Sequence, residues 1–145
     1  MWRNAVFRNN LFLGTRYAFE FTTVADEGFR DFDWNGWGTT RAIGSPSDPY
    51  FKWDNVRYDR IGDLPAGVED HGRAVAFSDL KKAKLPAAWD VAVPPGTRNL
   101  LLATGSAGIN GGTAIPNLND PYGPVGFPDL GAFERGSPLP HYGPR

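Results

Sequence analysis

The sequence predicts an all-β protein made of short strands and many loops, with a core built largely from aromatic rings. The chain has 18 glycines and 13 prolines among its 145 residues, and both residue types favour turns and irregular backbone. Aromatic residues make up 14% of it, whereas disordered chains are usually poor in them. Short apolar or alternating runs indicate the first strands at residues 5–7, 11–13 and 17–21.

Further elements follow along the chain. Residues 51–58 alternate aromatic and polar side chains and predict one strand, and the apolar run at residues 100–103 predicts a buried one. We expect at most one short helix, at residues 78–84, with Ser78 or Asp79 as its N-cap and Pro86 closing it. Residues 105–126 are rich in glycine, proline and asparagine and predict a long loop.

Composition and charge exclude several classes of partner. The 15 basic and 16 acidic residues give a net charge of -1, and no basic block is long enough to follow a nucleic acid backbone. The absence of cysteine excludes disulfides and thiolate metal sites. No apolar run approaches the roughly 20 residues of a membrane helix, so we expect neither nucleic acid nor a membrane as a partner.

A weak internal repeat suggests a stacked architecture. Residues 7–12, FRNNLF, align with residues 29–34, FRDFDW, at an offset of 22 residues, which is about one turn of a β-solenoid. A chance match in an aromatic-rich sequence is the alternative. We assign residues 1–64 to the coils and residues 65–145 to a loop-rich capping segment of the same domain.

The end of the sequence carries a more specific pattern, PDLGAFE at residues 128–134. It resembles the C-terminal signature of secreted right-handed parallel β-helix repeat proteins, a pectate-lyase-like, carbohydrate-active superfamily, and DFDWN at residues 31–35 is similar to part of that family's coil sequence. The resemblance implies a partial right-handed parallel β-helix of about two coils with a long loop-rich C-terminal segment. We interpret Asp129 and Glu134 as loop and cap carboxylates.

The same resemblance implies a function. It indicates the C-terminal fragment of an extracellular or periplasmic carbohydrate-active protein, of the polysaccharide lyase or glycoside hydrolase type, without a complete active site of its own. A solenoid needs about three repeats before stacking offsets chain entropy, so we expect a truncated product or remnant; its first residues lack the regions of a signal peptide. A non-catalytic glycan-binding or adhesive end domain is the alternative, and whether the chain is an enzyme stays open.

The candidate catalytic residues are Glu69 and His71. They flank Asp70, and an imidazole can act as acid or base near neutral pH. On a strand, residues two apart share a face, so Glu69 and His71 would point the same way; a plain loop is the alternative. No cofactor and no dedicated metal site are expected.

Further candidates for binding a polysaccharide are Asp31, Asp33, Trp37 and Arg57. On a strand, Asp31, Asp33 and Asn35 would share an outer face that suits a glycan or calcium, and a solvated face is the alternative. Trp37 lies between two glycines, where an exposed ring would stack on a sugar; core filling is the alternative. The guanidinium group of Arg57 matches a uronate carboxylate, unless it is simply solvated.

The N-terminal strands suggest self-association. With no earlier coil to cover them, the strands at residues 5–7 and 11–13 would leave unpaired edges beside exposed Leu11 and Leu13, which promotes pairing between chains. We therefore expect the chain to associate through an open N-terminal coil.

Overall fold

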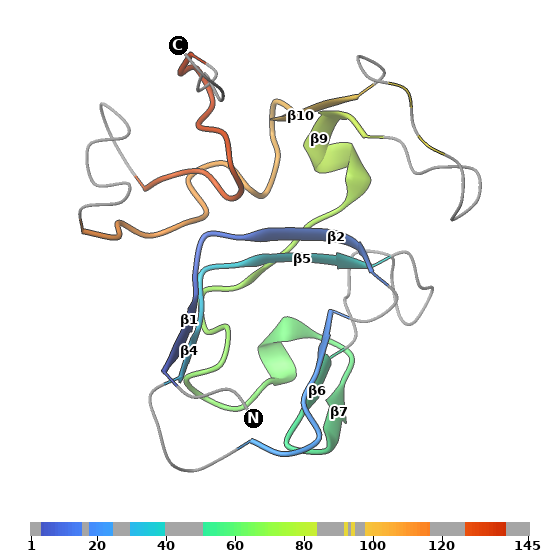
Figure 1. Cartoon of the computed structure of the whole chain (residues 1–145), viewed down its shortest axis with the longest axis vertical. Coiled ribbons are helices and arrows are strands. Elements are labelled where there is room, and N and C mark those ends of the chain that lie inside the picture. The colour runs from blue at the N-terminus through green and yellow to red at the C-terminus, as the bar shows by residue number, and fades with distance from the viewer. Residues whose placement is uncertain are drawn as a thin grey trace.

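The computed structural model describes residues 4–15, 18–24, 30–39, 51–83, 92, 94, 98–116 and 127–138. Within these ranges the fold is all-β, as the sequence predicts, and the only helical elements are two short 3-10 turns (Figure 1). The elements in chain order are β1 (Ala5–Phe7), β2 (Leu11–Thr15), β3 (Phe19–Glu20), β4 (Arg30–Phe32), β5 (Gly36–Thr39), β6 (Phe51–Trp53), β7 (Val56–Tyr58), η1 (Ile61–Asp63), β8 (Arg73–Ala74), η2 (Phe77–Asp79), β9 (Leu80–Lys82) and β10 (Asn99–Leu102).

Strands from successive stretches of the chain pair in parallel and lie in layers. β1 pairs with β4, β2 with β5 and β3 with β6, while β8 pairs with the other edge of β5. A parallel bridge between Phe32 and Val68 adds a third layer beside β4. The parallel pairing therefore continues past residue 64, which was the predicted end of the coils. The sheets are short, and the β-helix implied by the resemblance remains a prediction.

The register between the first two layers differs from the predicted repeat. Phe7 pairs with Phe32 and Leu11 with Gly36, an offset of 25 residues, so the predicted offset of 22 is wrong; Phe29 lies outside the described residues. Like rings stack in the observed register, since the centroids of Phe7 and Phe32 are 4.6 Å apart. The match of residues 7–12 with residues 29–34 predicted the wrong register, because similar residue types in sequence do not show which rings stack between layers.

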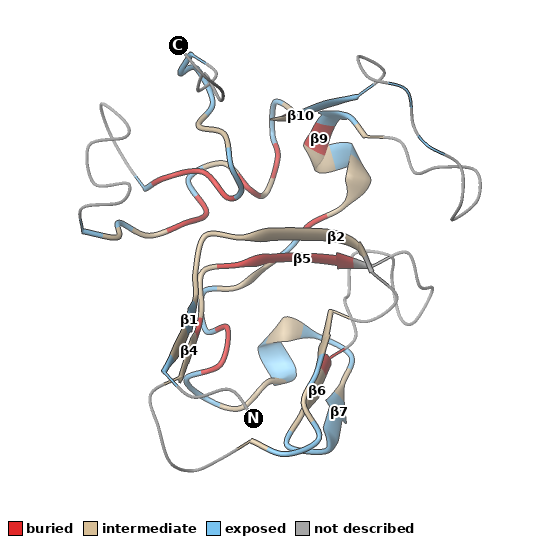
Figure 2. Ribbon diagram, viewed as in Figure 1, coloured by how far each residue is buried: buried red, intermediate tan, exposed pale blue. Residues whose placement is uncertain are grey.

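The sheet of β2 and β5 has an aromatic core on one face and an aliphatic layer on the other. On the aromatic side, Phe12 stacks on Trp37 at 4.3 Å. Residues 36–38 of β5 are buried (Figure 2), because chain from other layers approaches its backbone closely. A Cβ on Gly38 would lie 2.3 Å from the carbonyl oxygen of Val75 and 2.5 Å from the side chain of Leu13, so only glycine fits there.

Two local predictions are corrected. Residues 51–58 form an antiparallel hairpin of β6 and β7 rather than one strand, because Asp54 and Asn55 both adopt positive φ, 46° and 64°, as a tight two-residue turn requires. The predicted helix at residues 78–84 is wrong. Its first residues belong to η2, and from Leu80 the chain extends as β9, which pairs antiparallel with β10; residues 84–86 lie outside the described ranges.

The C-terminal segment is held mainly by caps rather than by long sheets. Asp129 accepts hydrogen bonds from the backbone N–H groups of Asn110, at 2.8 Å, and Arg135, at 2.7 Å, while Glu134 accepts one from Asp129 N–H at 2.9 Å. Both carboxylates therefore satisfy backbone N–H groups within this loop-rich segment, and Asp129 is buried; their role in closing a β-helix stays a prediction. Asn9, at the bend after β1, exchanges two 2.7 Å hydrogen bonds with the Thr113 backbone and so joins this segment to the layers.

Candidate functional site

A line of polar side chains, two buried and one half-buried, crosses the three layers at the bend between β4 and β5. The side-chain amide of Asn10 donates to the Asn35 Oδ1 at 2.9 Å, and that of Asn35 donates to the Glu69 Oε1 at 2.8 Å. We call Asn10, Asn35 and Glu69 the polar ladder. Each layer contributes one member, so the ladder satisfies polar groups that burial would otherwise leave unpaired.

Glu69 is the ionisable member of the polar ladder. Burial raises the pKa of its carboxyl group to about 7, against the opposing effect of the hydrogen bonds from Asn35. Its backbone lies in the left-handed region, with φ of 54°, a conformation that costs an ordinary residue of the order of 1–3 kcal/mol. A Cβ on Gly72 would lie 2.8 Å from the Glu69 Oε2, so glycine at position 72 makes room for the carboxyl group.

His71 lies just beyond the polar ladder and is oriented by Asp33. The Asp33 carboxylate accepts a hydrogen bond from the His71 backbone N–H at 2.7 Å and lies 2.8 Å from the ring Nδ1. A carboxylate can only accept, so the contact assigns the proton to Nδ1 and leaves Nε2 as the atom that a ligand can meet. The His71 side chain is 54% exposed.

Aromatic rings flank this imidazole. Trp34 stacks on His71 with centroids 4.0 Å apart and planes 6° apart, and Phe127 lies against Trp34 at 5.6 Å and 24°. Trp34 therefore contacts two other rings, and both of these are solvent-facing, since the His71 side chain is 54% exposed and Phe127 is 55% exposed. We call Asp33, Trp34, His71 and Phe127 the stacked site.

The stacked site forms because the extended backbone of β4 does not continue beyond Phe32. Trp34 has a φ of 60°, so the alternation predicted for residues 31–35 ends after Phe32. The prediction that Asp31, Asp33 and Asn35 share one outer face is wrong, since Asn35 is fully buried. Asp33 instead turns towards the next layer and meets a residue 38 positions later.

The other predicted binding residues lie apart from the stacked site. Asp31 forms an ion pair with Arg8, and Arg57, on β7, forms one with Glu20 on β3 at 2.7 Å. Trp37 is 3% exposed and packs in the aromatic core, so the prediction of an exposed ring between two glycines is wrong.

The sequence identified Glu69, His71 and Asp33 as candidates but did not predict which of them are in contact. Glu69 and His71 do not share a face, because Glu69 points into the polar ladder while His71 is solvent-facing. Phe127 was not selected, and no local signal connects it to Trp34. A clue to the polar ladder was present, since Asn10 and Asn35 are 25 residues apart, the offset of the observed register.

A polar cavity of about 400 Å³ lies beside Glu69, lined also by Arg60, Val68 and Asp70. Within the described ranges, no three or more acidic, histidine or cysteine side chains gather in a way that would hold a metal ion. The same residues include no helix long and apolar enough to cross a bilayer. Protein-family models, curated proteins and solved structures were compared with the chain, and none matches.

Proposed function

We propose that this chain is the end domain of an extracellular or periplasmic parallel β-helix protein and that it binds glycans at the stacked site. The proposed β-helix fold is supported by the parallel strand pairs and by the stacking of Phe7 on Phe32. The resemblance of residues 128–134 to a β-helix closing segment supports it as well. Stacked like residues are typical of repeat architectures, in which each layer contacts only its neighbours.

The observation that carries the glycan-binding proposal is the stacked site itself. Sugars bind to flat rings that have hydrogen-bonding groups at their edges. Phe127 supplies an exposed ring, and His71 supplies both a ring face and the free Nε2. Asp33 fixes the imidazole, so little side-chain entropy remains to be lost on binding.

Binding without turnover is the form of the proposal that the residues favour. Glycoside hydrolysis usually needs two carboxyl groups about 5–9 Å apart across the scissile bond. Here Glu69 is buried in the polar ladder, and Asp33 is engaged with His71. Neither carboxylate is therefore free to reach a glycosidic bond, and this supports binding rather than turnover as the proposal.

The test is calorimetric titration of the chain with uronate-rich and neutral oligosaccharides. We expect saturable binding that weakens at least about fivefold, or about 1 kcal/mol, in Phe127→Ala and His71→Ala, because each removes one exposed ring. Val56→Ala is the matched control, an exposed apolar residue on the hairpin, and should bind as the wild type does. Absence of binding to any oligosaccharide, or equal binding by all variants, would overturn the proposal.

Acid–base catalysis by His71 is a second candidate, favoured by the Asp33 contact. A carboxylate-oriented imidazole is a common general base. A lyase reaction would release unsaturated ends from a uronate polymer and stop in His71→Gln. We expect no release above background, and turnover that is lost in His71→Gln would replace the binding proposal with the catalytic one.

A further inference from the structure

The sequence contains two asparagine–glycine pairs, Asn35–Gly36 and Asn110–Gly111, and their surroundings differ. Such pairs are chemically labile, because the backbone nitrogen of the glycine can attack the side-chain carbonyl carbon of the asparagine and no Cβ hinders its approach. The reaction releases ammonia and consumes only water. Whether a pair reacts in the folded chain therefore depends on how firmly its atoms are held.

The atoms of the Asn35–Gly36 pair are held by hydrogen bonds. Asn35 is fully buried, and its side-chain Nδ2 donates to the Phe7 carbonyl oxygen at 2.7 Å and to the Glu69 Oε1 at 2.8 Å. Its Oδ1 accepts from the Asn10 side chain at 2.9 Å. The Gly36 N–H donates to the Asn10 carbonyl oxygen at 2.8 Å. Neither the attacking nitrogen nor the leaving amide can move unless the layers open.

The Asn110–Gly111 pair lies in an exposed turn. Asn110 is exposed with a φ of 49°, and its backbone N–H donates to the Asp129 Oδ1 at 2.8 Å while its carbonyl oxygen accepts from the Arg73 Nη2 at 3.3 Å. Among the described residues, no hydrogen bond involves its side-chain amide. The Gly111 N–H makes a longer hydrogen bond, 3.2 Å, to the Gly108 carbonyl oxygen. The Asn110 side chain is therefore free to turn towards the Gly111 nitrogen.

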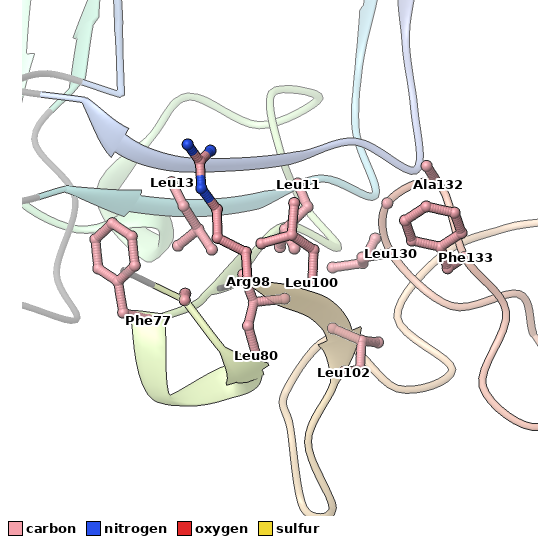
Figure 3. A pocket seen from close by; sticks show the side chains of 12 residues that line it. Leu11, Leu13, Phe77, Leu80, Arg98, Leu100, Leu102, Leu130, Ala132 and Phe133 are labelled. Atoms are coloured by element: carbon pink, nitrogen blue, oxygen red, sulfur yellow. The ribbon is translucent and has the colours of Figure 1, made fainter. Parts of the chain in front are cut away.

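Packing against Leu130 accounts for the glycine at position 111. A Cβ on Gly111 would lie 2.9 Å from the Leu130 Cγ, so a larger residue would displace this leucine. Leu130 lines an apolar cavity of about 350 Å³ between β2 and the C-terminal segment, together with Leu11 and Leu13 of β2 (Figure 3). These two leucines were expected to form a sticky open end and instead face this cavity. A shift of Gly111 would therefore disturb the contact between the C-terminal segment and the layers.

We propose that Asn110–Gly111 is a site of spontaneous deamidation and backbone isomerisation, and that this modification loosens the C-terminal segment. The Gly111 nitrogen forms a bond to the Asn110 Cγ and the bond from Cγ to Nδ2 breaks. The proton of the Gly111 N–H leaves with the amide as ammonia, and a cyclic succinimide remains. Water then adds to either ring carbonyl and gives an aspartyl or an isoaspartyl residue at position 110. This inference is independent of glycan binding at the stacked site.

The isoaspartyl product should alter the contacts of this turn. Its chain runs through the former side-chain carbons, which lengthens the backbone and moves Gly111. The backbone carbonyl of residue 110 becomes a free carboxylate beside the Arg73 guanidinium group, which favours this product. The new charge also lies near the Asp129 carboxylate, and like charges repel. Both changes should weaken the Asp129 cap and the 2.9 Å hydrogen bond from the Leu130 N–H to the Gly108 carbonyl oxygen.

The test is incubation of the folded chain in mildly alkaline buffer, followed by peptide mapping with tandem mass spectrometry. Conversion at Asn110 should be at least about tenfold faster than at Asn35, because reaction at Asn35 first requires the layers to open. In guanidinium chloride the two asparagines should convert at similar rates, since glycine follows each of them in an unfolded backbone. Enzymatic methylation of isoaspartyl residues identifies the isomerised product.

Hydrogen exchange of the aged chain measures the structural consequence. Amide exchange at Leu130 and Arg135 should become at least about tenfold faster in the converted fraction and stay unchanged in β4 and β5. Asn110→Gln should abolish this ageing, because ring closure from the longer side chain is much slower. Asn99→Gln is the matched control, since Asn99 is an exposed asparagine that precedes leucine, and it should age as the wild type does. If Asn110→Gln does not fold, the comparison of the two asparagines in the folded and unfolded wild-type chain decides.

Three results would overturn the proposal. They are no conversion at Asn110 in the folded chain under conditions that convert the unfolded chain, equal conversion at Asn110 and Asn35 in the folded chain, and conversion at Asn110 with unchanged exchange at Leu130 and Arg135. The first result would show that the turn protects the pair, and the third would show that the C-terminal segment tolerates the modified residue.

Discussion

The layered strands and the C-terminal segment are stabilised in different ways. In the layers, several side chains meet a similar side chain of the next layer, as Phe7 meets Phe32 and Asn10 meets Asn35. In the C-terminal segment, single carboxylates such as Asp129 satisfy several backbone N–H groups, with little sheet to support them. The layers therefore depend on shared packing, and the C-terminal segment depends on individual caps.

This difference predicts where a substitution acts. Loss of a stacked ring should lower the stability of all the layers together, because adjacent layers share the ring contact. Loss of a cap should open only the C-terminal segment, because its hydrogen bonds are local. The expected effects are ordered below from the largest to the smallest.

Phe32→Ala should have the largest effect. Phe32 is buried and contacts Phe7, Phe21 and Trp53, and removing such a ring costs about 3–5 kcal/mol. Urea unfolding would measure the change, with exposed Val6→Ala as the control at within about 0.5 kcal/mol. A Phe32→Ala chain that unfolds at the wild-type midpoint would show that the rings do not form a common core.

Glu69 should make stability depend on pH. Its pKa is raised from 4.5 to about 7 in the folded chain, so between these pH values the folded state binds more protons than the unfolded state. The free energy of unfolding should therefore fall as pH rises from about 4.5 and level off above about 7, by roughly 3 kcal/mol in all. Glu69→Gln should remove this slope, and denaturant unfolding at several pH values measures it. Parallel curves for the two chains would contradict the buried position of the carboxyl group.

Asp129→Asn should act locally in the C-terminal segment. It replaces a charged acceptor of two backbone hydrogen bonds, at a cost of about 2 kcal/mol. Hydrogen exchange should rise at Asn110 and Arg135 and stay unchanged in β4 and β5. Exposed Asp70→Asn, which weakens the hydrogen bond that Asp70 accepts from the Gly67 N–H, should have a smaller effect. Faster exchange throughout the layers would show that the two regions unfold together.

Self-association should respond to Val6 with little change in stability. Val6 is 54% exposed on β1, and β1 pairs on one side with β4, with no second partner among the described strands. We expect concentration-dependent dimers in analytical ultracentrifugation, reduced by Val6→Lys because lysine on an edge strand opposes pairing. Leu13→Lys would instead introduce a charge at the apolar cavity. A wild-type chain that stays monomeric at every concentration would rule out association through this edge.

Local sequence patterns predicted the elements better than their contacts. The strands at residues 5–7 and near 100–103 are observed, because apolar runs with turn residues on each side leave few other conformations. The second strand was predicted to be buried, and this is wrong for most of it, since Leu100 is 49% exposed and only Leu102 is buried. The hairpin at Asp54 and Asn55 was missed although both residue types tolerate positive φ. The register was missed because ring stacking between layers, rather than repeated letters, determines it.

The candidate site was predicted in part for a similar reason. Residue chemistry selected Asp33, Glu69 and His71, since carboxylates and imidazoles are few and reactive. Glu69 lies in the polar ladder, whereas Asp33 and His71 lie in the stacked site. This separation depends on the positive φ of Trp34 and Glu69. Both are residue types for which that backbone conformation is uncommon, so sequence alone gave no reason to expect it.

The most direct test of this account is nuclear magnetic resonance of the His71 ring. Asp33 and His71 meet only if the layers carrying β4 and β8 are stacked as described, and the chain has only two histidines, so assignment is simple. In neutral His71 we expect the proton on Nδ1, ring protons shifted by the stacked Trp34, and a change to the Nε2–H form in Asp33→Asn. Trp34→Leu should remove the ring shift but keep the Nδ1 proton. His71 resonances like those of free histidine, unchanged in Asp33→Asn, would contradict both the layer stacking and the stacked site.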